Sequence, residues 1–312
     1  ARDLLDHVRE TDTLSFTGSA DTAARIRSHA NVLRRSVRVN VEADSINSAI
    51  LGPDAAPGSD IFDLLVKEVV REMTLKAGQK CTAIRRILVP KRHLQAVGEA
   101  ISAKLGAMKV GNPRNPESNV GPVVNKAQQA ACLEGLRQLK QECAVLYGGD
   151  EKFQPLDADF AKSAFVQPTL LASKNGLSAK FVHDVEVFGP SATLIGCGDT
   201  NDLIAIARRG LGSLVASIFS NDSAFVRDVV LGIGDMHGRL VVVDSTVGAQ
   251  HTGHGNVVPS CLHGGPGRAG GGEELAGLRA VLLYHRRFVV QGPPSLLNSL
   301  AENSTDGGIV FS

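Results

Sequence analysis

Short apolar segments with the spacing of strands alternate with longer amphipathic segments along most of this 312-residue chain. Residues 14–16 and 37–41 have the period of two that is typical of strands, and residues 87–90 form a continuous apolar run of the kind found in buried strands. Between them, residues 61–73 carry apolar side chains three and four positions apart, which indicates an amphipathic helix. This alternation predicts an α/β fold built from layers of sheet and helix.

The rest of the chain continues this pattern. A helix capped by Ser19 or Asp21 is expected after the first strand. Further helices are expected over residues 93–108 and 126–142, and further short strands at residues 48–51, 145–147, 193–195, 215–219 and 240–243. Residues 281–284 and 288–290 are expected to form a late pair of strands, and residues 293–312, which lose periodicity, a frayed tail.

The charge and the cysteine content exclude several classes of protein. Thirty-three Lys and Arg residues oppose 32 Asp and Glu residues, so the formal charge of +1 leaves no electrostatic footprint for nucleic-acid binding. No apolar run approaches the roughly 20 residues that a membrane-spanning helix needs. The five cysteines are odd in number and scattered, which favours reduced thiols and a cytoplasmic location over a disulfide framework.

Cys81 stands in a context that suits a reactive thiol. It follows Gly78-Gln79-Lys80 at the junction of an expected helix and an expected strand. The glycine gives the backbone room to expose the sulfur, and the neighbouring Lys76 and Lys80 favour the thiolate. Taken alone, a cysteine beside a lysine is a weak signal, and a small buried hydrophobic side chain is the favoured interpretation.

Glu42 ends an expected strand in an apolar context. A carboxylate at the carboxyl end of a strand in an α/β sheet lies where ligands bind, and apolar surroundings raise its pKa toward the range of a general base. Glu186 and Phe188 precede a Gly-Pro turn that would hold both on a rigid loop. Each feature also has a plain interpretation, as a solvent-facing glutamate and as an ordinary turn.

Three other patterns carry weaker signals. Thr17-Gly18-Ser19 forms a strand–glycine–helix step whose backbone N–H groups could approach a pyrophosphate, although such steps are common in plain turns. Residues 265–270 satisfy G-x-G-x-x-G, but no strand lies close upstream and two glutamates follow, so a surface or active-site loop is expected there. A group of histidines and one cysteine has no standard zinc spacing, so no metal is assigned to His251, His254, Cys261 and His263.

Taken together and in order, these features resemble the aldehyde dehydrogenase superfamily. The resemblance rests on residues 16–19, Glu42, residues 78–82 and residues 186–190, and it extends to about Gly292. Residues 41–45, 71–86 and 263–275 resemble one branch of that family. This branch acts on CoA-thioester semialdehydes, such as 3,4-dehydroadipyl-CoA semialdehyde, in aerobic phenylacetyl-CoA or benzoyl-CoA degradation.

The resemblance implies a mechanism and a cofactor, NADP or NAD. Cys81 would be the nucleophile that forms a thiohemiacetal and then a thioester, and Glu42 the base that activates water to release the acid. For the cofactor, Glu186 would contact the nicotinamide ribose and Phe188 would pack near the nicotinamide. Gly18 and Ser19 would lie beside the cofactor phosphates or the nicotinamide.

The resemblance also implies a domain organisation. Residues 1–52 would be the remainder of an NAD(P)-binding Rossmann domain, and residues 53–279 the α/β catalytic domain. Residues 280–292 would form an oligomerisation arm, which favours a homodimer, and residues 293–312 a tail. The long segment that precedes the Thr-Gly-Ser turn in the family cannot be placed in residues 1–15, so an amino-terminally truncated chain is expected. The alternative is a non-catalytic fragment that serves as a structural or interaction module.

We therefore predict that this chain alone cannot form a complete dinucleotide site. The first strands of the cofactor fold, and the lysine and acid that meet the adenine ribose, belong in the family to the segment that cannot be placed here. Isothermal titration of the isolated chain with NAD and NADP should show no tight binding. Tight binding of either dinucleotide would contradict the prediction.

Overall fold

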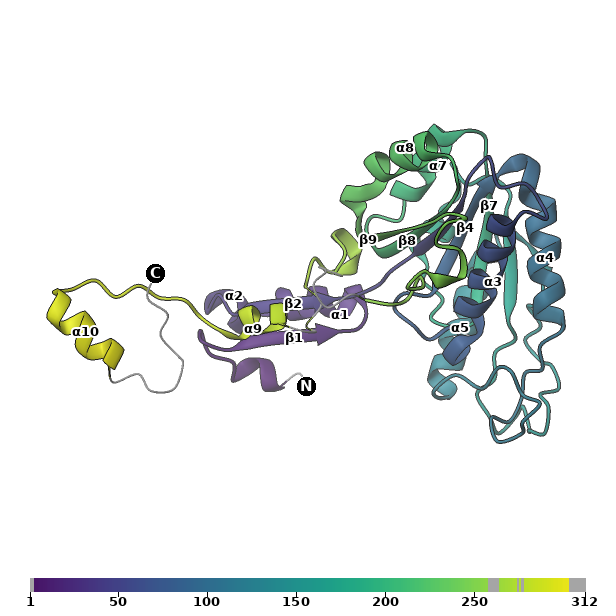
Figure 1. The fold of residues 1–312 in the computed structure, drawn as a ribbon. Coiled ribbons are helices and arrows are strands. Elements are labelled where there is room, and N and C mark those ends of the chain that lie inside the picture. Colours follow the sequence, from purple (N-terminus) through teal and green to yellow (C-terminus); the bar gives the residue numbers. More distant parts are fainter. Residues whose placement is uncertain (1–2, 258–263, 274, 276–277, 303–312) are drawn as a thin grey trace. The chain divides into compact units, whose positions relative to one another are not determined.

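A computed structural model describes residues 3–257, 264–273, 275 and 278–302 of the chain. It divides into two compact units, residues 1–274 and residues 275–312. Strands and helices alternate along much of the first unit, and most neighbouring strands are parallel (Figure 1), which confirms the α/β architecture. Among the described residues, no helix combines the length and the apolar composition needed to cross a membrane.

A seven-stranded sheet forms the centre of the first unit. Its strands lie in the order β5-β6-β7-β4-β3-β8-β9, and all neighbours are parallel except the antiparallel pair β5–β6. The strands are β3 (Asn47–Leu51), β4 (Ile84–Pro90), β5 (Cys143–Tyr147), β6 (Thr169–Ser173), β7 (Ser191–Cys197), β8 (Ser213–Phe219) and β9 (His237–Val243). Every residue of β3 and β8 is buried, as expected for central strands that helices cover on both faces.

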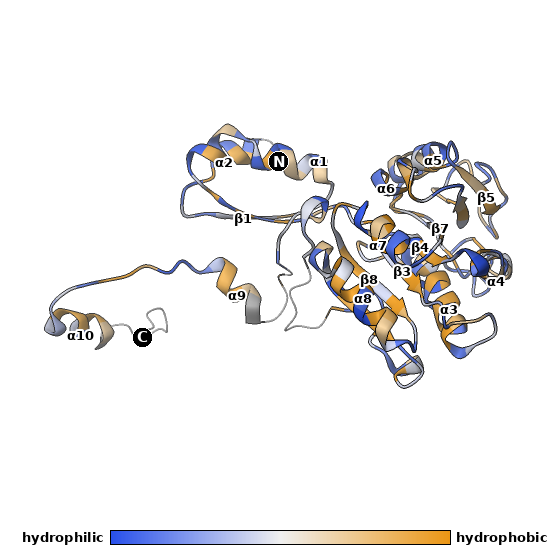
Figure 2. Ribbon diagram, turned by 90° about the horizontal axis from the view of Figure 1, so that it is seen from above, coloured by the Kyte–Doolittle hydropathy of each residue, from blue (hydrophilic) through white to orange (hydrophobic). Residues whose placement is uncertain are grey.

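Helices pack on both faces of this sheet. They are α3 (Asp60–Thr74), α4 (Leu94–Gly106), α5 (Lys126–Leu139), α6 (Phe181–Asp184), α7 (Thr200–Arg208) and α8 (Ser223–Ile233). Successive residues of β3 point to opposite faces of the sheet. Ala49 and Leu51 pack with α3 and α4, whereas Ile50 packs in the core that includes α5, α7 and α8. The apolar colouring of β3 and α3 in Figure 2 follows from this burial.

A second, small sheet precedes the large one. Strands β1 (Thr13–Thr17) and β2 (Arg38–Glu42) are parallel, and Thr17 is paired with Glu42. Helices α1 (Ala20–Arg27) and α2 (Ala30–Arg34) connect them. The Ser19 side chain accepts from the Thr22 amide at 3.3 Å, which confirms Ser19 as the cap of α1. Short 3-10 helices occur at Asp3–Asp6, Leu75–Gly78, Lys91–His93, Gly234–Met236, Gly248–Gln250 and Gly267–Ala269.

The prediction of strands in the second unit is wrong. Residues 281–284 lie in helix α9 (Leu278–Tyr284), no strand forms at residues 288–290, and helix α10 (Pro294–Glu302) occupies part of the expected frayed tail. A lone apolar segment satisfies its backbone groups within a helix, whereas a strand needs a neighbour. Leucine and alanine favour that outcome, and proline suits the first turn of α10. The assignment of residues 280–292 to an oligomerisation arm stays a prediction.

The predicted domain boundary at residue 52 also stays a prediction. Strand β3 lies before that position, yet it is hydrogen-bonded to β4 on one side and to β8 on the other. Residues 47–51 are therefore central to the large sheet rather than part of the small one. Only residues 43–46 separate the end of β2 from the start of β3.

A buried arginine and histidine join β4 to α6 and α7. Arg86 is fully buried and donates from Nη1 to Ile206 O and from Nη2 to Ala207 O, both at 2.9 Å. Its Nη1 also lies 3.0 Å from His183 Nδ1, while His183 Nε2 lies 2.8 Å from Gly176 O. These contacts suit a neutral ring protonated on Nε2. Burial, with the charge of Arg86, lowers the pKa of His183 to about 4.

We expect this histidine to destabilise the protein in acid. Between pH 6.5 and about 4, the unfolded chain takes up a proton at residue 183 that the folded chain excludes, so stability falls as pH falls. From pH 7 to pH 5, His183 should cost about 2 kcal/mol of unfolding free energy. His183→Asn should remove that share when urea unfolding is compared at the two pH values. An equal loss in wild type and variant would contradict this.

Candidate active site

Cys81 lies in an exposed turn between α3 and β4. In the 3-10 helix Leu75–Gly78 that follows α3, Lys76, Ala77 and Gly78 have φ angles of 54°, 53° and 68°. The chain then turns through Cys81 and enters β4. The side chain of Cys81 is exposed, whereas Cys132, Cys143 and Cys197 are buried. Cys81 is therefore not the buried hydrophobic residue that its sequence context alone allowed.

The backbone just before Cys81 touches the loop of residues 186–190. A Cβ added to Gly78 would lie 2.2 Å from Gly189 O and 2.9 Å from Pro190 Cα. Only glycine permits this approach, and only glycine adopts the left-handed backbone there without strain. The sequence motif was expected to give the sulfur room. The structure uses that room to hold two loops together.

A buried asparagine orients the carbonyl groups on either side of this turn. Asn47, at the start of β3, donates from Nδ2 to Cys81 O at 2.8 Å and to Ala83 O at 3.0 Å. Its Oδ1 accepts from Ser45 Oγ at 2.6 Å and from Val215 N at 3.0 Å. The sequence reasoning missed Asn47, although a polar residue at the start of an apolar strand was the available signal.

Glu42 lies at the carboxyl end of β2, as predicted, and is half-buried. Its backbone oxygen accepts from Gly18 N at 3.1 Å. The glycine-rich segment expected to be a surface or active-site loop runs along the same strand, because Ala43 N donates to Ala269 O at 2.9 Å and Gly272 N to Val41 O at 3.0 Å. A Cβ on Gly272 would lie 2.3 Å from Val41 O, so glycine is required there.

Glu186 lies next to the segment that follows Glu42. Its Oε2 accepts from Ser45 N at 3.2 Å, and 11% of its side chain is exposed. In the described part of the chain, Oε1 has no hydrogen-bond partner and lies 4.0 Å from Arg85 Nε. Burial raises the pKa of Glu186 to about 7, against the opposing effect of Arg85.

Phe188 is exposed, and its backbone is held from α5. Its carbonyl oxygen accepts from Gln128 Nε2 at 2.8 Å and from the Cys132 thiol at 3.4 Å. Burial raises the pKa of Cys132, so this thiol stays protonated and able to donate. Two residues of α5 thus fix the loop that carries Glu186.

Two backbone N–H groups at the amino terminus of α1 already have hydrogen-bond acceptors within the chain. Ser19 caps the helix, and Ala20 N donates to Asp44 Oδ1 at 3.0 Å. A Cβ on Gly18 would lie 2.6 Å from Cζ of the Phe16 ring, so close packing accounts for this glycine. The roles of Gly18 and Ser19 at a cofactor therefore stay predictions.

Three neighbouring strands bring these residues together. Cys81 precedes β4, the Glu186 loop precedes β7 and residues 43–46 precede β3, and these strands are adjacent in the order β7-β4-β3. Because the three strands are parallel, the segments before them meet at the end of the sheet where these strands begin. This arrangement brings together Cys81, Glu186 and the residues beside Glu42.

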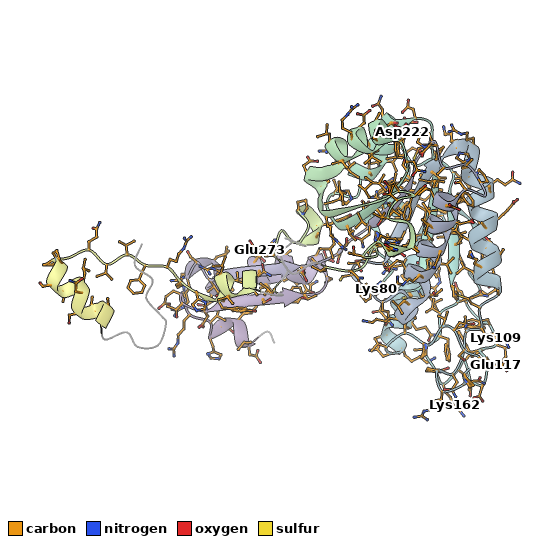
Figure 3. All side chains as sticks on the ribbon, in the orientation of Figure 1. Lys80, Lys109, Glu117, Lys162, Asp222 and Glu273 are labelled. Carbon is orange, nitrogen blue, oxygen red and sulfur yellow. The ribbon has the colours of Figure 1, made fainter. Side chains whose placement is uncertain are left out.

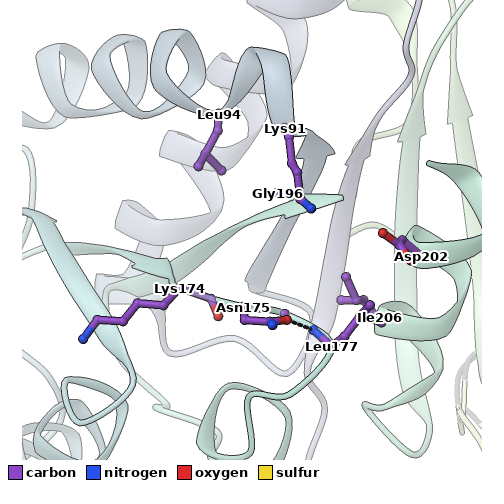
Figure 4. Close-up of a pocket in the computed structure, with 10 residues that line it drawn as sticks. Lys91, Leu94, Lys174, Asn175, Leu177, Gly196, Asp202 and Ile206 are labelled. Atoms are coloured by element: carbon purple, nitrogen blue, oxygen red, sulfur yellow. Dashed lines mark hydrogen bonds between the residues drawn. The ribbon is translucent and has the colours of Figure 1, made fainter. Parts of the chain in front are cut away.

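A separate cavity of about 360 Å³ lies at the opposite end of the sheet, where these strands finish (Figure 4). Lys91 and Lys174 follow β4 and β6, and Gly196 lies near the end of β7, so these residues mark the carboxyl ends of the strands. The cavity is therefore not part of the Cys81 site.

Two of the histidines considered as metal ligands, His251 and His254, have structural contacts. His254 is fully buried with Nδ1 2.6 Å from Ser217 Oγ, and burial lowers the pKa of His254 to about 3. His251 Nδ1 accepts from Gly253 N at 3.0 Å. Within the described residues, no cluster of His, Cys, Asp and Glu has the arrangement of a metal site, and Cys261 and His263 lie outside them.

Comparison with known proteins identifies the family. The model of the aldehyde dehydrogenase family matches residues 1–271. The chain belongs to this family. The resemblance inferred from the motifs is thereby confirmed.

Individual relatives agree with this assignment. The chain is 66% identical over 266 residues to 3,4-dehydroadipyl-CoA semialdehyde dehydrogenase of Aromatoleum evansii, which covers 85% of this chain and 52% of that protein. It is 38% identical over 192 residues to protein MaoC of Klebsiella aerogenes, which covers 61% and 56%. The chain thus spans about half the length of these relatives.

Solved structures confirm the aldehyde dehydrogenase fold. Betaine aldehyde dehydrogenase of Staphylococcus aureus in complex with NAD+ superposes with a TM-score of 0.74 at 23% identity, over 88% of this chain and 50% of that one. 3,6-Anhydro-L-galactose dehydrogenase in complex with NAP has a TM-score of 0.75 at 24% identity, over 90% and 54%.

We expect Glu186→Gln to stabilise the protein more at high pH than at low pH. The folded state keeps Glu186 protonated up to about pH 7, while the unfolded carboxyl ionises near its ordinary pKa of 4.5, so wild-type stability falls as pH rises between these values. Glutamine retains the neutral shape. The advantage of the variant in urea unfolding should grow by about 2 kcal/mol from pH 5 to pH 8. A constant difference would contradict the raised pKa.

Proposed function

We propose that this chain carries the nucleophile and the base of an NAD(P)-dependent aldehyde dehydrogenase that oxidises a CoA-linked semialdehyde to the acid. The observation that carries the proposal is the exposed thiol of Cys81, which follows the left-handed backbone of residues 76–78, where Gly78 contacts the loop of Glu186. Support for the substrate class comes from the 66% identity to a 3,4-dehydroadipyl-CoA semialdehyde dehydrogenase.

The thiolate of Cys81 would add to the carbonyl carbon of the aldehyde and form a thiohemiacetal. The Cys81 backbone N–H would donate to the developing oxyanion. A bound nicotinamide would supply the hydride acceptor, and loss of hydride from the thiohemiacetal carbon would leave Cys81 as a thioester. The Asn47 contacts to Cys81 O and Ala83 O keep the turn in one conformation during these steps.

The residues near Cys81 suit the nicotinamide end of a dinucleotide. Glu186 Oε1 is buried and has no hydrogen-bond partner in the described part of the chain, so it is available to accept from a ribose hydroxyl. Phe188 offers an exposed ring on the same loop. The choice of NADP over NAD is implied only by the branch that the chain resembles.

Glu42 would take a proton from the water that attacks the thioester, which releases the carboxylic acid and the free thiol. An acylating enzyme, in which a second thiol releases the product, needs no such base. Glu42 therefore favours hydrolysis. Chromatography of the product would distinguish a free acid from a thioester.

A second candidate function is that of a non-catalytic fragment with a structural or interaction role. It is favoured by one observation, that the chain spans about half the length of its relatives. A rapid-mixing assay for a burst of reduced nicotinamide, run on this chain and on a longer form with a complete cofactor domain, separates the two. A homodimer also remains a proposal, and it rests on the family resemblance alone.

In a form with a complete cofactor site, we expect Cys81→Ala to abolish aldehyde oxidation. Glu42→Gln should permit one burst of hydride transfer but slow turnover by about 10²- to 10⁴-fold, because the thioester then lacks its base. Cys143→Ala, at a buried thiol in β5, serves as the control and should leave activity unchanged. Unchanged activity in both site variants would eliminate the mechanism.

A further inference from the structure

Arg85 is the second residue of β4 and joins the two loops of the site. It is 5% exposed. Its Nη1 donates to Gly189 O at 2.7 Å, and its Nη2 donates to Gly78 O at 2.8 Å and to Lys80 O at 3.4 Å. The guanidinium thus binds the turn before Cys81 on one side and the loop of Glu186 on the other.

The same guanidinium contacts two side chains of the second loop. Arg85 Cζ lies 5.7 Å from the centre of the Phe188 ring, and Arg85 Nε lies 4.0 Å from Glu186 Oε1. A planar fork of donors can hold carbonyl groups in two directions at once and face an aromatic ring, which a lysine ammonium on its flexible stem cannot reproduce. The geometry at Arg85 therefore requires arginine rather than any cation.

The lysine expected to favour the thiolate has another partner. Lys80 Nζ donates to Glu72 Oε1 at 2.5 Å, and their side chains are 15% and 2% exposed (Lys80 is labelled in Figure 3). Glu72 therefore offsets the charge of Lys80. The nearby His254 is neutral, because burial lowers its pKa to about 3, and Lys76 is exposed to solvent.

Arg85 is a buried cation that donates to the carbonyl groups of Gly78 and Lys80, three residues and one residue before Cys81. The anionic or ionisable groups that act on it are Glu186, Cys132, Glu72 and Cys81. Of these, Glu72 is paired with Lys80, Cys132 is a neutral thiol because burial raises its pKa, and burial raises the pKa of Glu186 to about 7. Burial lowers the pKa of Arg85 too, yet a guanidinium stays protonated at neutral pH. Because its pKa is about 7, Glu186 is ionised in part at neutral pH and offsets only part of the charge of Arg85, and the remainder acts on Cys81.

We propose that Arg85 is a positioning residue: it fixes the turn of Cys81 against the loop of Glu186 and supplies the positive charge that favours the Cys81 thiolate. This inference rests on the proposed role of Cys81 as a nucleophile. It adds a residue that carries both the geometry and the electrostatics of that thiol.

The test measures alkylation of Cys81 by iodoacetamide from pH 5 to pH 10, followed by mass spectrometry of the peptide that contains Cys81. In the wild type, the thiol pKa should lie below its ordinary value of about 8.5. Arg85→Met should raise it by about one unit and slow alkylation at pH 7 by about tenfold. Arg208→Met is the matched control, because Arg208 also donates to a backbone carbonyl, Gly232 O, and its profile should stay that of the wild type.

Arg85→Lys separates the two parts of the proposal. It keeps the charge, so the thiol pKa should stay within a few tenths of a unit of the wild type. It loses the simultaneous bonds to Gly78 and Gly189, so hydrogen exchange of the amides in residues 78–81 and 186–189 should speed up.

A wild-type pKa at or above 8.5, or an unchanged profile in Arg85→Met, would overturn the electrostatic part. Exchange in Arg85→Lys as slow as in the wild type would overturn the positioning part. If Arg85→Met does not fold, a wild-type pKa at or above 8.5 still overturns the electrostatic part, and hydrogen exchange in Arg85→Lys still tests the positioning part. Alkylation needs neither substrate nor cofactor. Failure of the proposed function, seen as oxidation that survives Cys81→Ala, is therefore a distinct result.

Discussion

The backbone contact between Gly78 and Gly189 is the constraint on which the rest of the site depends. It brings the turn of Cys81 against the loop of Glu186 at a separation that no other residue at position 78 allows. Strands β4 and β7 are parallel neighbours, so the segments that enter them already lie side by side. The contact turns that proximity into a fixed geometry, and the guanidinium of Arg85 spans it.

The sheet explains why such distant parts of the sequence meet. Glu42, Cys81 and Glu186 come just before or at the approach to β3, β4 and β7, which are neighbours in that sheet. Two hydrogen bonds connect the segment that enters β3 to the segments before β7 and β4. Ser45 N donates to Glu186 Oε2, and Asn47 Nδ2 donates to Cys81 O. The site is thus built from segments that enter the strands, while a separate cavity occupies the edge where the strands end.

Much of this fold follows from sequence patterns. Strands β1 and β2, helix α3 and the cap at Ser19 have strong periodicity or capping chemistry, and the structure confirms them. Strand β6 was missed because residues 169–173 are buried on both faces and so show no alternation. The second unit was assigned strands because apolar runs of three or four residues fit a strand or a helix equally well.

The site could be predicted from the sequence only in part. The motif residues are recognisable by type and order, but the roles of Asn47 and Arg85 depend on which carbonyl groups the fold places beside them. Likewise, Lys80 was expected to act on the thiol because it is adjacent in sequence, whereas the fold pairs it with Glu72. Proximity along the chain predicts exposure and backbone shape better than it predicts charge partners.

The left-handed run at residues 76–78 has a consequence for how this region tolerates change. Lys76 and Ala77 adopt a backbone that costs each of them on the order of 1 kcal/mol, which glycine or asparagine would not incur. A search for stabilising substitutions would therefore find favourable ones close to Cys81, the proposed nucleophile. Such gains would also loosen the turn that presents the sulfur, so this segment is one where thermal robustness and reactivity are expected to be in conflict.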